Sequence, residues 1–429
     1  MARDTLTEPP SQDSPFNRTA QHDAKRAAIL SQAAKLFNTK GSRATTLLDI
    51  AESLGLTKTS LYYYVKTKEE LIYQCYMAAL DRHHRTLDEI ARQYSTPVER
   101  AEGFFRATFE DWKSAEEGKT SHVAVLLEIA SLKGSHRTEV EERYIGMFKR
   151  LRENMREGIA DGSMRSFDAT SATRAMIGSV DWIFSWLHQI PRDKITEAAA
   201  HAWDIFWLGL STEKGEYTPG ELPFDNLAAA ELLGFDREEQ KRLKQEAFYK
   251  TGTRFFNKQG FNSTSLDEIA DHLNVTKGAF YYHIKNKEDL LFNCYTRSLD
   301  IMGKIYAEVA THKVSGVEKI DRTFRQTFYI QNSDQGPLIR YNTITALPQE
   351  RRRQITRRTD QGQERFGDFI REGIDDGSIR DIDVFVAQNL IAGAINAAMD
   401  IQLWRRVDDL DTAAIEYFDI FFNGLKPRA

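Results

Sequence analysis

The sequence predicts an all-α protein made of two similar units in tandem. Apolar residues recur at helical spacing along nearly the whole chain, and the alternation typical of strands is hard to find. A block at residues 41–76 recurs without a gap at residues 260–295, and 16 of these 36 aligned positions are identical. Chance would give about two identities, so the chain contains an internal duplication.

Composition limits the classes of protein to which this chain can belong. The 429 residues divide through the repeat into two units of about 200 residues each. The chain shows no apolar run of about 18 residues and no signal peptide, so we expect a cytoplasmic protein without a membrane segment. Cys75 and Cys294 are too few for a disulfide framework or a cysteine-rich metal site. With a net charge of −5, nucleic acid could be bound only by local basic patches.

Composition shifts and the repeat together give the domain order. Prolines and polar residues at the N-terminus predict a disordered tail, and Gly, Pro and charged residues predict a linker where the repeat restarts. Each unit should contain a small N-terminal helical domain and a larger helical domain. The expected segments are a tail at 1–23, domains at 24–67 and 68–212, a linker at 213–236, and domains at 237–286 and 287–429.

Residues 46–65 have a helix-turn-helix pattern, which the second unit repeats. Gly55 suits the conformation of the turn, and Thr57 is placed to cap the second helix. Leu61 and Val65 lie four residues apart and should face the core. The remaining lysine, hydroxyl and tyrosine side chains suit phosphates, base edges and thymine methyl groups. A solvated helix would leave three consecutive tyrosines unexplained.

Three motifs carry a resemblance to a known family. They are Gly-x-x-x-Thr-Thr/Ser-x-x-x-Ile-Ala from Gly41 and Gly260, Leu/Phe-Tyr-Tyr-x-Val/Ile, and Lys-x-Lys-Glu-Glu/Asp-Leu. Together they resemble the TetR family of bacterial transcriptional regulators, in which three N-terminal helices bind double-stranded DNA. The DNA-binding candidates are Thr46, Thr57, Lys58, Thr59, Ser60, Tyr62, Tyr63, Tyr64 and Lys68 in the first unit, and Ser265, Thr276, Lys277, Gly278, Tyr281, Tyr282, His283 and Lys287 in the second.

The duplication departs from the family pattern, because ordinary members carry one unit and bind DNA as homodimers. The simplest consequence is a single-chain pseudo-dimer with a pseudo-two-fold axis. Its four-helix bundle would combine residues 172–188, 196–210, 384–403 and 412–425. A dimer of chains remains open. Thr59 and Ser60 are replaced by Gly278 and Ala279, so we expect an imperfect palindromic operator with unequal half-sites.

The resemblance also implies a helical pocket for a small-molecule effector, with acyl-CoA thioesters as one candidate class. Candidate ligand-binding residues are Phe105, Phe109, Trp112, Leu126 and Ile129 in the first unit, and Phe324, Phe328, Tyr341, Arg352 and Arg357 in the second. The two arginines belong to a basic cluster that could meet phosphates. Aromatic residues at this spacing are also typical of plain core, and the arginines could form a solvated face.

Motifs for catalysis are lacking, and the histidines form no recognisable metal pattern, so we expect neither an enzyme nor a bound cofactor or metal. The leading hypothesis is a nucleoid-associated repressor that a small molecule releases from DNA. Two alternatives remain. Ligand-insensitive DNA binding would favour an architectural DNA-binding protein, and absent DNA binding would favour a protein-interaction module.

Overall fold

The computed structural model describes residues 15–42, 44–126, 129–212, 216–222 and 237–427, and it confirms the all-α fold. Unit one contains α1 (Pro15–Lys40), α2 (Leu47–Ser53), α3 (Lys58–Tyr64), α4 (Lys68–Gln93), α5 (Pro97–Glu116), α6 (Gly134–Ala160), α7 (Ala169–Asp181) and α8 (Ile195–Leu208). Unit two contains α9 (Arg237–Ser263), α10 (Leu266–His272), α11 (Lys277–His283), α12 (Lys287–Thr311), α13 (Gly316–Asn332), α14 (Gln349–Asp375), α15 (Val384–Ala397) and α16 (Leu410–Asn423). Within the described ranges, no helix combines the length and apolarity that a membrane span needs.

Helices begin at residues whose type favours capping, as the sequence predicts for Thr57. Thr57 and Thr276 cap α3 and α11, and each side chain accepts a hydrogen bond from a backbone N–H three residues later. Thr67, Ser265 and Asn286 cap α4, α10 and α12 in the same way. The helix-turn-helix geometry therefore begins with local hydrogen bonds that the sequence encodes twice.

The turn between the two short helices requires a left-handed residue in both units. Gly55 has φ 65°, and Asn274, at the same repeat position, has φ 53°. Asparagine tolerates this region better than other non-glycine residues because its short polar side chain can bond locally. The second unit thus keeps the turn without the glycine.

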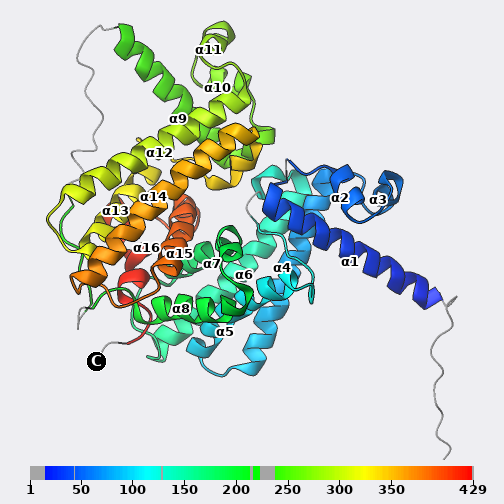
Figure 1. Ribbon diagram of the computed structural model, residues 1–429, viewed down its shortest axis with the longest axis horizontal. Helices are drawn as coiled ribbons and strands as arrows, with labels where there is room; N and C mark the ends of the chain where they lie inside the picture. Colours follow the sequence, from blue (N-terminus) through cyan, green and yellow to red (C-terminus); the bar gives the residue numbers. More distant parts are fainter. Residues whose placement is uncertain (1–14, 43, 127–128, 213–215, 223–236, 428–429) are drawn as a thin grey trace, which may run out of the picture.

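The two units pack together through α7, α8, α15 and α16, which lie together where the two units meet (Figure 1). Helices α7 and α15 cross closely at Gly178 and Gly393, which occupy equivalent repeat positions. The sequence predicts longer helices here. Instead α7 ends at Asp181 and α15 at Ala397, and short 3-10 turns follow both.

Arginine side chains exchanged between the units close this interface. Arg165 donates to the Gly424 carbonyl oxygen at 2.7 Å and pairs with Asp419. Arg380, its repeat equivalent, donates to the Gly209 carbonyl oxygen at 2.8 Å and to Asp204 at 2.8 Å. Because each unit gives and receives the same bonds, the packing has pseudo-two-fold symmetry.

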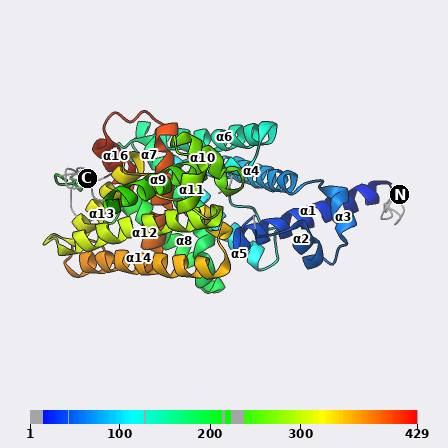
Figure 2. The same cartoon turned by 90° about the horizontal axis from the view of Figure 1, so that it is seen from above.

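The first helix-turn-helix domain (α1–α3) and the second (α9–α11) lie at different sides of the molecule in Figure 1, and Figure 2 shows α1–α3 extending beyond the other helices. The expected tail boundary at residue 23 falls inside α1, while residues 1–14 lie outside the described ranges. Within the expected linker, Tyr217 is buried and donates its N–H to Asn423 at 2.6 Å. The described part of the linker therefore packs against unit two.

Candidate nucleic-acid interface and ligand cavities

In the first domain, α3 anchors itself through Leu61, which is fully buried, and exposes its tyrosines. Tyr62 is 43% exposed and Tyr63 is 77% exposed. The Lys58 ammonium group lies 5.7 Å from the centre of the Tyr62 ring, and Tyr64 stacks on His22 of α1. Lys58, Thr59 and Ser60 are exposed at the start of the helix. This surface combines ammonium, hydroxyl and aromatic groups, which are suited to contacts with phosphates and with base edges in a major groove.

The second domain presents the same surface with different chemistry. Tyr281 is 44% exposed and Tyr282 is 82% exposed. Asp267 of α10 pairs with the Lys277 ammonium at 2.6 Å and accepts a hydrogen bond from the Tyr281 hydroxyl at 3.2 Å. The bond from Lys277 lowers the pKa of Asp267, so this carboxylate stays ionised. In the first domain the equivalent position holds Leu48, which is 46% exposed.

Several predicted DNA-binding residues also have structural partners. The Thr46 hydroxyl bonds with Asp49 at the start of α2, and Ser265 caps α10. Lys287 donates to the Thr264 carbonyl oxygen at 2.8 Å and lies over the Phe261 ring, which ties the start of α12 to the second helix-turn-helix domain. His283 is half-buried beside Phe248, while Gly278 is exposed with open space around it.

One pair of residues that sequence reasoning missed connects the domains to the rest of each unit. Asn38 of α1 donates to the Val123 carbonyl oxygen at 2.8 Å and accepts from the Val125 N–H at 3.0 Å. Asn257 of α9 makes the same two bonds, at 2.8 and 3.0 Å, to Leu338 and Arg340. The two asparagines occupy equivalent repeat positions just before Gly41 and Gly260, which is the signal that could have identified them.

Each unit also contacts the helix-turn-helix domain of the other unit. The 3-10 segment Ile129–Ser131 packs against α9, and a Cβ placed at Gly260 would lie 3.9 Å from that of Ser131. A Cβ placed at Gly41 would collide with Thr345 in the 3-10 segment Tyr341–Ala346. The segment that contains Val125 and Ile129–Ser131, and the segment that contains Arg340 and Tyr341–Ala346, therefore each contact both helix-turn-helix domains.

The predicted ligand-binding residues fall into two groups. Phe105, Phe109, Phe324 and Phe328 are fully buried in the packed core, where each contacts other aromatic rings. Trp112 packs on the same core and is partly buried. By contrast, Leu126, Ile129 and Tyr341 line cavities.

A cavity of about 370 Å³ lies mainly in unit two, between α12, α13, α14 and α15, with Trp182 of unit one in its wall, and we call it the unit-two cavity. Tyr341, Met302 and Tyr306 contribute to its mostly apolar wall, and Gly303 and Gly362 also line it. At the repeat equivalents of these glycines, unit one carries His84 and Met147. Larger side chains thus occupy the corresponding places in unit one.

Arg352 and Arg357 line a shallow groove on α14 together with Arg353. The same groove contains the carboxylates of Asp360 and Glu364. The other two arginines of the cluster pair with α12: Arg351 with Asp289 at 3.0 Å, and Arg358 with Asp300 at 2.6 Å. The structure therefore divides the basic cluster between a groove and two ion pairs.

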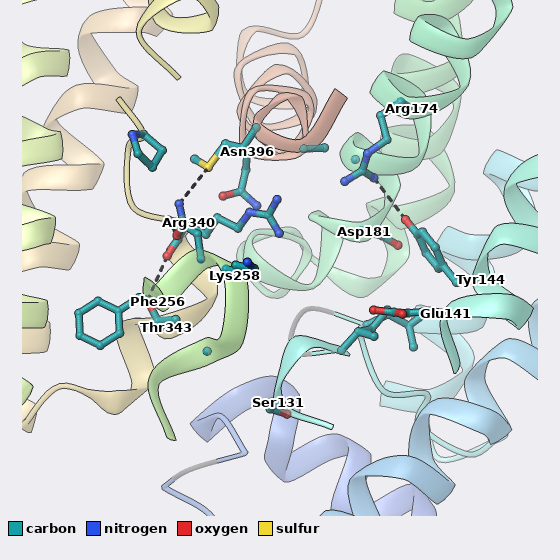
Figure 3. Close-up of a pocket in the computed structure, with 18 of the residues that line it drawn as sticks. Ser131, Glu141, Tyr144, Arg174, Asp181, Phe256, Lys258, Arg340, Thr343 and Asn396 are labelled. Carbon is teal, nitrogen blue, oxygen red and sulfur yellow. Dashed lines mark hydrogen bonds between the residues drawn. The ribbon is translucent and has the colours of Figure 1, made fainter. Parts of the chain in front are cut away.

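A larger cavity, of about 1000 Å³, lies between the two units and is called here the inter-unit cavity. Figure 3 shows Lys258, Arg340 and Asn396 on the side of unit two, and Tyr144 and Arg174 on the side of unit one. Leu126 and Ile129 line it as well. Sequence reasoning could not find this cavity, because its walls come from segments far apart in the chain.

Comparison with known proteins agrees with this architecture. The family model described as bacterial regulatory proteins, tetR family, matches residues 29–75 and 248–294. The model for the tetracyclin repressor-like C-terminal domain matches residues 94–210 and 314–404. Both domains of one family therefore occur twice, in the order that the repeat gives.

Curated relatives include the HTH-type transcriptional repressor KstR2 of Mycolicibacterium smegmatis, which is 30% identical over 166 residues, or 38% of this chain and 79% of that protein. KstR2 of Rhodococcus jostii is 31% identical over 175 residues, or 38% of this chain and 76% of that protein. A solved structure of KstR2 from Mycobacterium tuberculosis is 24% identical and covers 41% of this chain and 89% of that chain, with a TM-score of 0.35. AibR, solved with isovaleryl coenzyme A and operator DNA, is 25% identical and covers 40% of this chain and 94% of that chain, with a TM-score of 0.36.

These matches, the two helix-turn-helix domains and the two helical C-terminal domains lead to one conclusion. The chain belongs to the TetR family of bacterial regulatory proteins and carries both domains of that family in duplicate.

Proposed function

We propose that this protein is a sequence-specific transcriptional repressor that binds an imperfect palindromic operator as a single-chain pseudo-dimer. The observation that carries the proposal is the pair of helices α3 and α11, each exposing tyrosines and a lysine, joined through one bundle in one chain. Relatives of about 30% identity are transcriptional repressors. The half-sites are unequal because Asp267 neutralises part of the second surface, whereas Leu48 leaves Lys58 without that partner.

Release from DNA follows from a ligand that favours a different arrangement of the two domains. The two α-helical surfaces must enter successive major grooves together, about one helical turn apart. A ligand that binds the non-matching arrangement better by about 1.4 kcal/mol weakens DNA binding tenfold. Asn38 and Asn257 transmit the change, because they connect the domains to segments that line the cavities.

The apolar part of the effector binds in the unit-two cavity, and an acyl-CoA thioester is the candidate class. Replacing Gly303 by His and Gly362 by Met, the residues of unit one, should fill this cavity. We expect decanoyl-CoA to release DNA from the unmodified protein and not from this double variant. DNA affinity without ligand serves as the control and should stay within about twofold. Equal release of DNA from both proteins would exclude this cavity as the binding site of the acyl chain.

Sedimentation of the full chain, alone and with its own promoter fragment at two salt concentrations, tests the DNA-binding proposal. A 49.2 kDa monomer that binds one-to-one, more weakly at high salt, would support the pseudo-dimer. A stable dimer of chains would carry four helix-turn-helix domains and require a longer operator. Absence of binding at either salt concentration would refute the DNA-binding function.

A further inference from the structure

We infer that the inter-unit cavity binds the anionic group of a single amphipathic ligand per chain, with that group held between unit one and the second helix-turn-helix domain. This inference rests on the proposed function, since it assigns a binding place to the charged end of the effector. The ligand class is an apolar body carrying a phosphate or similar anion.

The wall of the inter-unit cavity is positively charged. Seven basic side chains line the cavity against two acidic ones, so the lining has a net charge of +5 in a chain whose net charge is −5. One acid, Glu141, already pairs with Arg137 at 2.7 Å. Burial raises the pKa of the other acid, Asp181, to about 6, and Arg174 lies nearby. An anion entering this space would therefore meet an excess of positive charge.

The basic side chains of the inter-unit cavity come from both units. Lys149 and Arg152 belong to α6 of unit one, whereas Arg254 and Lys258 belong to α9, the first helix of the second helix-turn-helix domain. An anion bridging these groups would tie that domain to unit one. Ligand binding would thus act on the position of a DNA-binding domain directly, without an intervening helix.

The inter-unit cavity adjoins the unit-two cavity. Trp182, Gln331, Asn396 and Met399 line both cavities, so the two spaces adjoin. Trp182 and Gln331 are both 6% exposed, and within the described residues the indole N–H of Trp182 and the amide oxygen of Gln331 have no hydrogen-bond partner. Buried polar atoms are rarely left in this state. A ligand crossing the junction with a polar linker would satisfy them, its apolar body in the unit-two cavity and its anion between the units.

The repeat shows that this site exists once. At the positions equivalent to the seven basic and two acidic residues, the chain carries two basic and one acidic residue, a net charge of +1. Lys149 corresponds to Glu364, Arg174 to Asn389, and Lys258 to Thr39. A homodimer of identical chains must form its interface sites in symmetric pairs. Duplication removes that constraint, so the two sides could diverge into one anion site.

The α14 groove is the competing place for the anion, because it contains Arg352 and Arg357, the candidates from the sequence for contact with phosphates. That groove is shallow, touches one unit only, and holds Asp360 and Glu364 beside its arginines. The inter-unit cavity is larger and contacts a DNA-binding domain. The geometry therefore favours the cavity between the units.

Isothermal titration of the full chain with decyl phosphate tests the inference, with decanol and inorganic phosphate as separate probes of the two ends. We expect one site per chain, with decyl phosphate binding more tightly than either fragment. Arg254→Glu combined with Lys258→Glu should weaken binding at least tenfold. Both side chains are exposed, so the variant should fold. Lys149→Glu, which installs the residue of unit two, should independently weaken binding.

Two matched controls locate the site. Lys35→Glu changes the repeat equivalent of Arg254, and Arg352→Glu with Arg357→Glu changes the α14 groove. Both variants should bind within about twofold of the unmodified protein. Two equal sites per chain, loss of binding in either control, or no binding of decyl phosphate would overturn the inference. Because the titration contains no DNA, a failure of the proposed DNA-binding function would appear separately in the sedimentation experiment.

Discussion

The close crossing of α7 and α15 gives a prediction that tests the intramolecular bundle directly. A Cβ added at Gly178 would lie 2.3 Å from the Cβ of Ala397 and 3.0 Å from the Gly393 carbonyl oxygen. Carbon atoms in contact are normally about 3.5–4.0 Å apart, so the helices would have to separate by more than about 1 Å. Overpacking of this kind costs about 1–3 kcal/mol, while the higher helix propensity of alanine returns about 1 kcal/mol at most. Gly178→Ala should therefore destabilise the protein by roughly 1–2 kcal/mol.

Gly303→Ala is the matched control, because Gly303 lies within α12 and an added Cβ would meet no atom within 4 Å. That change should leave the free energy of unfolding unaltered or raise it by up to about 1 kcal/mol. Combining Gly178→Ala with Ala397→Gly removes the first collision and should restore part of the lost stability. Urea unfolding followed by circular dichroism measures all three variants on one scale.

The two glycine variants separate the possible outcomes. If Gly178→Ala is as stable as Gly303→Ala, then α7 and α15 do not cross at this distance, and the intramolecular bundle described here is refuted. If Gly178→Ala destabilises the protein, the affinity of the variant for a whole operator should fall more than its affinity for a half-site. The difference arises because the bundle fixes the separation of the two DNA-binding domains, which matters only when both must bind.

Three further changes exploit differences between the units or the exposure of a single side chain. Asp267→Leu installs the residue of the first domain and removes the ion-pair partner of Lys277. If Lys277 then contacts a phosphate, the slope of log affinity for DNA against log salt concentration should steepen by about 0.9. An unchanged slope, measured by filter binding, would show that Lys277 does not reach a phosphate. Asp181→Asn installs the residue of unit two. Because burial raises the pKa of Asp181 from 3.8 to about 6, its neutral form is favoured in the folded state and stability falls as pH rises through this window. The variant should therefore gain about 1–3 kcal/mol at pH 8 and little at pH 4, and an equal gain at both would contradict this. Tyr282→Ala alters a side chain that is 82% exposed, so it should change the melting temperature little while weakening operator binding.

Local and periodic features were predictable from the sequence. The repeat located both helix-turn-helix patterns, and the caps at Thr57 and Thr276 follow from residue type and spacing. The structure adds where the second unit is shorter. Helix α13 ends three residues earlier than its counterpart α5, and the segment that follows it is one residue shorter. Such features depend on neighbours in the chain, which a sequence shows directly.

Features that depend on distant residues were not predictable in the same way. Arg165 and Arg380 each follow an Asp-Gly-Ser sequence that both units share, at residues 161–163 and 376–378. Only the packed structure shows that each arginine reaches across to the other unit. Helical spacing could not separate the fully buried Phe105 and Phe324 from residues that line a cavity, since both kinds face inward. Asp267 escaped notice because its effect requires Lys277 to fold back on it from the next helix.

The pattern of divergence between the units bears on mechanism. Positions that hold the units together remain paired, as with the Gly178 and Gly393 crossing and the two exchanged arginines. Differences occur at the proposed DNA-binding surface, where Leu48 corresponds to Asp267, and at the cavities, where His84 corresponds to Gly303. A homodimer cannot make such changes on one side only, because each substitution appears in both subunits. In a duplicated chain with an intact bundle, the proposed binding of DNA in one preferred orientation and the proposed response to one ligand would both follow from the same loss of symmetry.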